Sequence, residues 1–152
     1  MDFISHSLKK IKPSPTMVIT AKARELRAAG EKIISLSAGE PDFDTPEHVK
    51  DAAIKAINMG YTKYTNVEGI PELKQAIVNK FKNDNEIDYN IDQVIVGVGG
   101  KQILFNALFA SLNSGDEVII PTPYWVSYPD MTILAGGIPK FLNCNEENNF
   151  KI

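Results

Sequence analysis

The spacing of apolar positions changes where residues 93–98 meet the segment that starts at Lys101. Residues 93–98 are mostly Val, Ile and Gly, a composition typical of a short buried strand. From Lys101 onward, apolar or small residues recur three and four positions apart, which keeps one face of a helix turned to a core. These residues are Leu104, Ala107, Leu108, Ser111 and Leu112. We therefore predict a strand that passes through a glycine-rich turn into a helix.

Three glycines and a cation occupy this turn: Gly97, Gly99, Gly100 and Lys101. The first N–H groups of a helix have no acceptor within the helix and point in one direction. Such a turn can therefore bind an anion, and a phosphate is the anion it favours. The alternative, that the glycines only permit a tight turn and close helix packing, is open on spacing alone.

The turn does not fit the common nucleotide-binding loops. A Walker A loop would need glycine at position 95 and Ser or Thr at position 102, whereas the chain has Ile95 and Gln102. A dinucleotide-binding fingerprint would also need a small residue at position 102. We therefore expect a phosphate other than that of a nucleotide.

Three more helices are predicted before this turn. The first runs from about Met17 to Ala29, with Thr16 as its cap and Gly30 as its stop. The second begins at Pro46, and the third runs from Pro71 to a polar turn at 83–86. The second helix would be capped by Thr45 and closed by Gly60, with inward residues Val49, Ala52, Ala53, Ala56 and Ile57; the inward residues of the third would be Leu73, Ala76, Ile77 and Phe81.

Short strands are predicted at 33–37, 117–120 and 138–142, and between the last two the loop 121–129 runs into a helix. Alternation of strands and helices predicts an α/β fold with a mostly parallel sheet. Ligands of such sheets bind beyond the carboxyl ends of the strands. Both the glycine turn and the start of the 121–129 loop follow predicted strands, so we expect the site there.

Composition limits the class of protein. The 152 residues, 43% of them hydrophobic and 23% charged, suit one ordinary soluble domain. A net charge of -3 argues against a nucleic-acid partner, and no segment resembles a secretory signal or a membrane span. The single cysteine, Cys144, cannot form an internal disulfide, which favours a reducing compartment over the alternative of a reactive thiol. We expect a cytoplasmic protein with no membrane partner and no metal site.

Five motifs are spaced along the chain: Lys12–Thr16, Gly39–Pro46, Lys63-Tyr64 with Gly69–Pro71, Gly99–Gln102 and Pro123–Pro129. In this order and spacing they resemble the motifs of class I aminotransferases, pyridoxal-phosphate enzymes of fold type I. The likeness covers essentially all of the chain and is to the bacterial branch of aspartate aminotransferases, which includes aspartate/prephenate aminotransferases.

The resemblance implies an N-terminal arm and helix followed by the first part of the mostly parallel sheet of the large domain. Residues 1–45 would be the arm and a small-domain segment, and 46–152 the start of the cofactor-binding domain. Family members are much longer, so we expect a truncated chain without the Schiff-base lysine and with no catalytic residue of its own. Ser7-Leu-Lys-Lys10 mimics the motif around that lysine only superficially, since it lies on the arm.

The resemblance also implies residues that bind pyridoxal 5'-phosphate. Gly99, Gly100 and Lys101 would form the phosphate cup, and Trp125 would stack on the pyridine ring. Tyr64 would reach the cofactor phosphate of a neighbouring subunit, so the protein would be a homodimer with shared active sites. Without the resemblance, Trp125 and Tyr64 are equally compatible with packing roles.

Substrate contacts follow from the same resemblance. The backbone of Gly39 would approach the α-carboxylate of the amino acid, although a turn glycine is the simpler interpretation. Trp125 would also border the substrate, and the residues facing its distal carboxylate would be Lys12, Ser14, Thr16 and Lys101. For Lys12 a solvated arm lysine is the alternative.

The implied reaction transfers the amino group of aspartate to 2-oxoglutarate, giving oxaloacetate and glutamate, and extends to prephenate, giving arogenate. Two alternatives are kept. One is another fold type I aminotransferase with aromatic amino acids or alanine as substrates, and the other is a non-catalytic phosphate-binding module.

Overall fold

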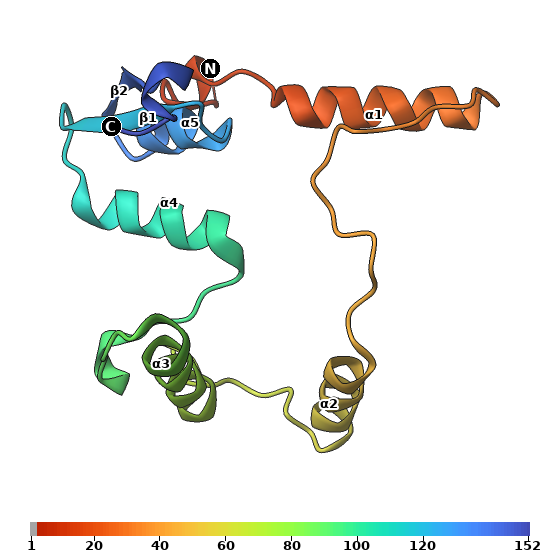
Figure 1. Ribbon diagram of the computed structural model, residues 1–152, viewed down its shortest axis with the longest axis vertical. Coiled ribbons are helices and arrows are strands. Elements are labelled where there is room, and N and C mark those ends of the chain that lie inside the picture. The colour runs from red at the N-terminus through yellow and green to blue at the C-terminus, as the bar shows by residue number, and fades with distance from the viewer. Residues whose placement is uncertain (1–2) are drawn as a thin grey trace. The chain divides into compact units, whose positions relative to one another are not determined.

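The computed structural model describes residues 3–152, which fall into two compact units. One unit combines Met1–Gly39 with Lys101–Ile152, and the other is Glu40–Gly100. Figure 1 shows the elements of both units along the chain. Each unit is described by itself below.

The first unit contains a parallel strand–helix–strand motif. Strand β1 (Glu117–Thr122) pairs with β2 (Ile138–Asn143), and Glu117 lies opposite Ile138. Parallel strands cannot be joined by a tight hairpin, and helix α5 (Ser127–Leu134) makes the crossover and packs on both strands (Figure 1). The predicted α/β class and the two C-terminal strands are therefore confirmed.

The buried centre of this unit lies between α5 and the two strands. Its buried side chains are Ile120, Met131, Thr132 and Cys144. The Thr132 hydroxyl donates a hydrogen bond to the Tyr128 carbonyl 3.0 Å away, so this fully buried polar group is satisfied within the helix.

Four longer helices precede or flank this motif. Helix α1 (Pro15–Ala28) precedes the second unit in the chain, and helix α4 (Gly99–Ser111) begins with the last two residues of that unit and continues into the first. The second unit contains α2 (Glu47–Asn58) and α3 (Pro71–Asn85). Three short 3₁₀ turns complete the described elements: η1 (Leu8–Lys10), η2 (Ile91–Gln93) and η3 (Glu146–Asn148).

Two predicted strands are wrong. The strands predicted at 33–37 and 93–98 are absent: residues 33–37 and 94–98 have no regular secondary structure, and Gln93 ends the 3₁₀ turn Ile91–Gln93. Among the described residues, the only sheet is the two-stranded one of β1 and β2, so neither segment has a strand to pair with. Apolar alternation predicts an extended backbone, but a strand also requires a neighbour that supplies its hydrogen bonds.

The predicted caps need correction as well. Helix α1 begins at Pro15, so the N-cap position belongs to Ser14 and not to Thr16. At α2 the N-cap position belongs to Pro46 and not to Thr45. At α1, Pro15 suits the first helical position because its ring pre-sets the φ angle. This preference outweighs capping by the hydroxyl of Thr16, one residue later. The polar turn predicted at 83–86 starts later, because α3 continues to Asn85 and Glu86 closes it at φ +58°.

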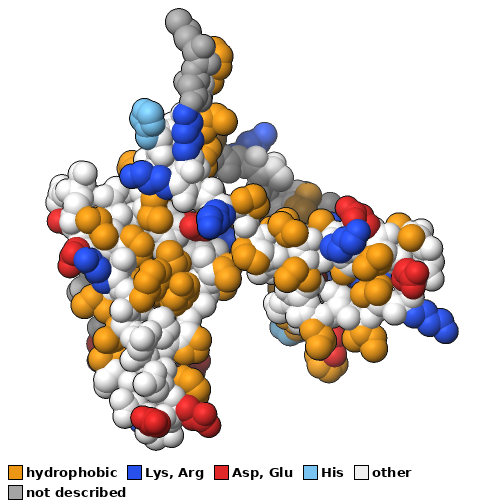
Figure 2. Space-filling view, turned by 90° about the horizontal axis from the view of Figure 1, so that it is seen from above, with side chains coloured by type: hydrophobic (Ala, Val, Ile, Leu, Met, Phe, Trp, Pro, Cys, Tyr) orange, Lys and Arg blue, Asp and Glu red, His pale blue; other side chains and the backbone are white. Residues whose placement is uncertain are grey.

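The predicted inward faces of α2 and α3 are largely exposed. Val49 and Ile57 of α2 and Leu73 of α3 keep about half of their surface exposed, with fractions of 46%, 62% and 43%. Figure 2 shows hydrophobic side chains spread over the visible surface. Periodicity indicates which side of a helix suits a core, whereas the described residues provide no layer that covers these sides. Among the described helices, none combines the length and the apolar run needed to cross a membrane.

Gly137 lies immediately before β2, in a tightly packed part of the first unit. A Cβ atom there would lie 3.0 Å from Leu112 Cδ1, 3.1 Å from Thr132 Cγ2 and 3.2 Å from the Asp116 carbonyl oxygen. Gly137→Ala should therefore lower the free energy of unfolding by about 1 to 3 kcal/mol, measured by urea denaturation with circular dichroism. Gly39→Ala is the control, because a Cβ at Gly39 meets no atom within 4 Å. Equal stability of the two variants would contradict the described packing.

Candidate functional site

The head of α4 carries the glycine turn. Gly99 has φ +79°, a left-handed conformation that costs other L-residues about 1 to 2 kcal/mol, and its N–H donates to the Gly97 carbonyl 3.2 Å away. A Cβ atom on Gly99 or Gly100 would meet no atom within 4 Å. Close helix packing therefore does not explain Gly100, and the space in front of this turn is open.

The first turn of α4 is electrostatically suited to an anion. The helix has 13 residues and no acidic residue in its first turn, so no side-chain carboxylate there opposes an incoming anion. The N–H groups of a first turn have no acceptor within the helix, and the helix dipole places partial positive charge there. Lys101 adds a full positive charge to the same turn.

Trp125 lies in the short segment between β1 and α5. Its exposed fraction is 42%, so the indole is not a core residue of this structure. The Trp125 and Tyr128 rings meet edge to face, with centroids 5.6 Å apart and planes at 82°. On the other side of the segment, Tyr124 stacks on Phe141 of β2 with centroids 5.1 Å apart. These two contacts hold the loop that carries Trp125 against α5 and β2.

Lys101 and Trp125 are in contact. The Lys101 Nζ atom lies 4.7 Å from the centre of the indole ring, a cation–π arrangement. An exposed contact of this kind contributes about 0.5 to 1 kcal/mol. It connects the first turn of α4 with the carboxyl end of β1, where sheets of this type bind ligands.

The arm residues belong to the same compact unit as Lys101 and Trp125. Ser14 has an extended backbone, and its carbonyl accepts the Val18 N–H at 3.1 Å, while Lys12 is exposed. In the described part of the chain, no hydrogen bond or ion pair joins Lys12, Ser14 or Thr16 to Lys101 or Trp125.

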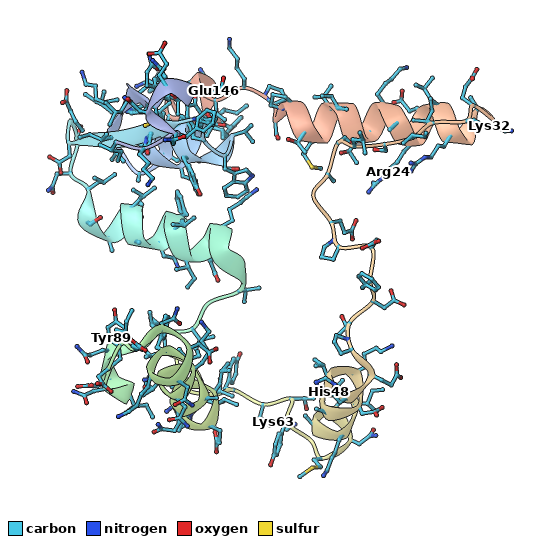
Figure 3. The ribbon with its side chains drawn as sticks, viewed as in Figure 1. Arg24, Lys32, His48, Lys63, Tyr89 and Glu146 are labelled. Atoms are coloured by element: carbon cyan, nitrogen blue, oxygen red, sulfur yellow. The ribbon has the colours of Figure 1, made fainter. Side chains whose placement is uncertain are left out.

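Gly39 and Tyr64 are both exposed. Gly39 ends the first unit's N-terminal segment, and its surroundings are open. Tyr64 belongs to the other unit and lies between α2 and α3, next to Lys63, which Figure 3 labels. The Tyr64 side chain is fully exposed and borders an open pocket of about 740 Å³ that Tyr61 and Ile70 also line. Tyr64 therefore has no packing role in its own unit.

Residues 31–152 match the sequence profile of the family Aminotransferase class I and II. The chain belongs to this family. It is 62% identical over 152 residues to a probable aspartate/prephenate aminotransferase of Rickettsia bellii and 60% identical to the aspartate/prephenate aminotransferase of Cereibacter sphaeroides. Each match covers 100% of this chain and 38% of the relative, so the chain spans about 38% of the length of these relatives.

Solved structures agree with the family assignment. The aspartate aminotransferase from Thermus thermophilus with maleate superposes with a TM-score of 0.95 at 48% identity, over 100% of this chain and 40% of that chain. The aspartate aminotransferase from Rhizobium meliloti gives a TM-score of 0.92 at 47% identity, over 100% of this chain and 38% of that chain. The fold is therefore the first part of a fold type I aminotransferase, as the sequence predicts.

Membership of this aminotransferase family implies pyridoxal phosphate, and the described residues fit such a group. The open turn at Gly99 and Gly100 leaves room for a phosphate at a helix start, which is a site that anions favour. The exposed indole of Trp125 offers a flat surface to an aromatic ring.

Two further aromatic residues help to place Trp125 and were not predicted: Tyr128 contacts the indole, and Tyr124 stacks on Phe141 of β2. Their signal was present in the aromatic spacing of the segment 123–129, where Tyr, Trp and Tyr occur within five positions. The spacing indicates an aromatic cluster but does not show which ring stays exposed for a ligand.

The glycine turn of this aminotransferase chain can be tested by comparing two substitutions in its first turn. Gly99→Ala should lower the free energy of unfolding by about 1 to 2 kcal/mol, because alanine is strained at φ +79°. Gly100→Ala should change it by less than about 0.5 kcal/mol, because its surroundings are open and alanine favours helices. Urea denaturation of both variants measures the difference, and equal losses would contradict the described turn.

Proposed function

We propose that the protein is a pyridoxal-phosphate-dependent aminotransferase that converts aspartate and 2-oxoglutarate to oxaloacetate and glutamate. We propose the conversion of prephenate to arogenate as its second reaction. The single observation that carries the proposal is the open glycine turn at the head of α4, with Lys101 against an exposed indole. The names of the relatives from Rickettsia bellii and Cereibacter sphaeroides support the choice of substrates.

The chain's own residues bind and orient the cofactor in this proposal. Gly99, Gly100 and Lys101 form the phosphate cup, and the N–H groups of Gly100 and Lys101 donate charge-assisted hydrogen bonds to the phosphate. Trp125 fixes the plane of the ring by stacking. When bound, the cofactor supplies an electron sink for the negative charge left when the α-proton leaves the amino acid. We place no catalytic residue among these 152 residues.

The substrate is bound by groups of the arm and of Gly39. The missing side chain of Gly39 allows its backbone to approach the α-carboxylate. Lys12, Ser14, Thr16 and Lys101 contact the distal carboxylate, and Trp125 borders the substrate. A lysine is a point charge on a flexible stem and can follow carboxylates of different reach, as aspartate and prephenate require.

Tyr64 gives the proposal its quaternary structure. Because its side chain is fully exposed, it is free to contact a second subunit. We propose a cytoplasmic homodimer in which the Tyr64 hydroxyl of one subunit donates a hydrogen bond to the cofactor phosphate of the other.

We also propose a domain boundary between residues 45 and 46. The arm and a small-domain segment precede this boundary, and the large domain starts after it.

The gene sequence downstream of the codon for Ile152 distinguishes this enzyme from the alternative, a non-catalytic phosphate-binding module. If the reading frame continues beyond Ile152 into a Ser-x-x-Lys motif, the encoded full-length protein has the lysine that an aminotransferase needs. A stop codon after Ile152 would favour the module. The full-length protein is the material for the experiments that follow.

Trp125→Ala should raise the dissociation constant of pyridoxal phosphate, because the ring loses the surface on which it stacks. Stacking alone contributes about 0.5 to 1.5 kcal/mol, or roughly 2- to 12-fold in affinity. Equilibrium dialysis of the full-length protein measures the constant. Trp125→Phe is the control, since it keeps a flat aromatic surface and should lose less. Unchanged affinity of the alanine variant would remove Trp125 from the site.

Lys12→Ala should reduce kcat/KM for aspartate by about 10- to 150-fold, because a charge-assisted contact contributes about 1.5 to 3 kcal/mol. The loss for alanine, which has no distal carboxylate, should be small. Steady-state kinetics with each amino donor measure both values, and Lys10→Ala is a matched control because it removes the same charge from the same arm. Equal losses for aspartate and alanine would exclude a specificity role. A wild-type protein that prefers aromatic donors or alanine to aspartate would favour the alternative aminotransferases.

A further inference from the structure

A close contact joins two distant segments of the unit Glu40–Gly100. The N–H of Val96 donates a hydrogen bond to the Glu68 carbonyl oxygen 2.9 Å away. Val96 precedes the glycine turn at the head of α4, and Glu68 lies in the segment between α2 and α3 that contains Tyr64. The contact therefore connects the two segments to which the proposed function assigns phosphate binding.

Gly69 allows these two segments to approach each other. Its φ is +109°, and a Cβ atom there would lie 2.8 Å from Val96 Cγ2 and 2.9 Å from Val96 Cβ. Both atoms belong to a side chain that branches next to the backbone, so Val96 could not move aside without its backbone also moving. Any other residue at position 69 would therefore push the two segments apart.

Lys74 of α3 makes a second contact with Glu68. Its side chain is only 9% exposed, although lysine is rarely buried, and its Nζ atom lies 3.9 Å from Glu68 Oε1. The N–H of Lys74 donates to the Ile70 carbonyl at 3.1 Å, which fixes the lysine at the start of α3. Glu68 is thus held through its backbone by Val96 and through its carboxylate by Lys74.

We propose that Glu68, Gly69, Lys74 and Val96, here called the Glu68 clasp, are positioning residues for the phosphate of the cofactor. Tyr64 has no packing contacts of its own to fix it, because its side chain is fully exposed. The position of Tyr64 must therefore be set by the backbone of its own segment. The clasp attaches that segment to residues 94–98, which lead into Gly99. This inference rests on the proposed function, in which Tyr64 of one subunit and the glycine turn of the other bind one phosphate.

A comparison of two ligands separates positioning from general stability. Pyridoxal 5'-phosphate and pyridoxal share the ring and the aldehyde, so the ratio of their dissociation constants reports the phosphate contacts alone. Equilibrium dialysis of the full-length protein measures both constants. Tyr64→Phe gives the scale, because it removes one hydroxyl donor from the proposed phosphate contacts.

Gly69→Ala should reduce the preference for pyridoxal phosphate over pyridoxal by about 3- to 10-fold, comparable to the loss of one hydrogen bond. Gly30→Ala is the matched control. Gly30 has a similar positive φ of +90°, and a Cβ there meets no atom within 4 Å, so it adds backbone strain without touching the clasp. Its ratio should equal that of the wild type.

Lys74→Met provides a second variant if Gly69→Ala does not fold, because methionine keeps the buried length of the side chain and loses only the charge that faces Glu68. It should reduce the same ratio, by less than Gly69→Ala. An unchanged ratio in Lys74→Met and in any folded Gly69→Ala protein would overturn the clasp while the proposed function stood. A wild-type protein with no preference for the phosphorylated ligand would overturn both.

Discussion

The proposed site depends on one feature of the backbone: the start of α4 is open, and a Cβ atom at Gly99 or Gly100 would meet no atom within 4 Å. This start is formed by Gly99, which adopts a left-handed backbone, and by Gly100, which has no side chain to cover the turn. Bare N–H groups are costly when they have no partner, so a turn of this type favours an anion that supplies acceptors. The position of Lys101 in the same turn adds charge where that anion would bind.

The motif of β1, α5 and β2 provides the rigid base for the second part of the site. Tyr124, just after β1, stacks on Phe141 of β2. The Cys144 N–H, just after β2, donates a hydrogen bond to the Thr122 hydroxyl 3.4 Å away, so these contacts join the carboxyl end of β1 to β2. Trp125 is the next residue after Tyr124, so its indole is exposed on a loop that these contacts hold against β2. Regular elements hold a binding side chain more accurately than a free loop does, and this supports the proposal that the exposed indole is a stacking surface.

The sequence predicted those features whose cause is local. β1, β2 and α5 follow from apolar runs bounded by turn residues, and the glycine turn follows from a change of period. Residues 33–37 and 93–98 were predicted as strands and are not, because a strand depends on a neighbour that the pattern of one segment does not reveal. The caps at Thr16 and Thr45 were wrong for a different reason. Helix α1 begins at Pro15, before Thr16, because proline suits the first helical position, and at α2 the N-cap position belongs to Pro46.

Gly69 shows most clearly where local patterns stop being informative. Its sequence context, between Glu68 and Pro71, indicates only a turn, and a positive φ is the usual reason for glycine in a turn. The structure adds a second reason, which is the side chain of Val96 far along the chain. The φ of +109° lies beyond the left-handed region that asparagine tolerates, and the contact with Val96 independently admits no Cβ atom. Glycine at position 69 is therefore required both by its backbone conformation and by a long-range contact, and the contact can be recognised only when both segments are seen together.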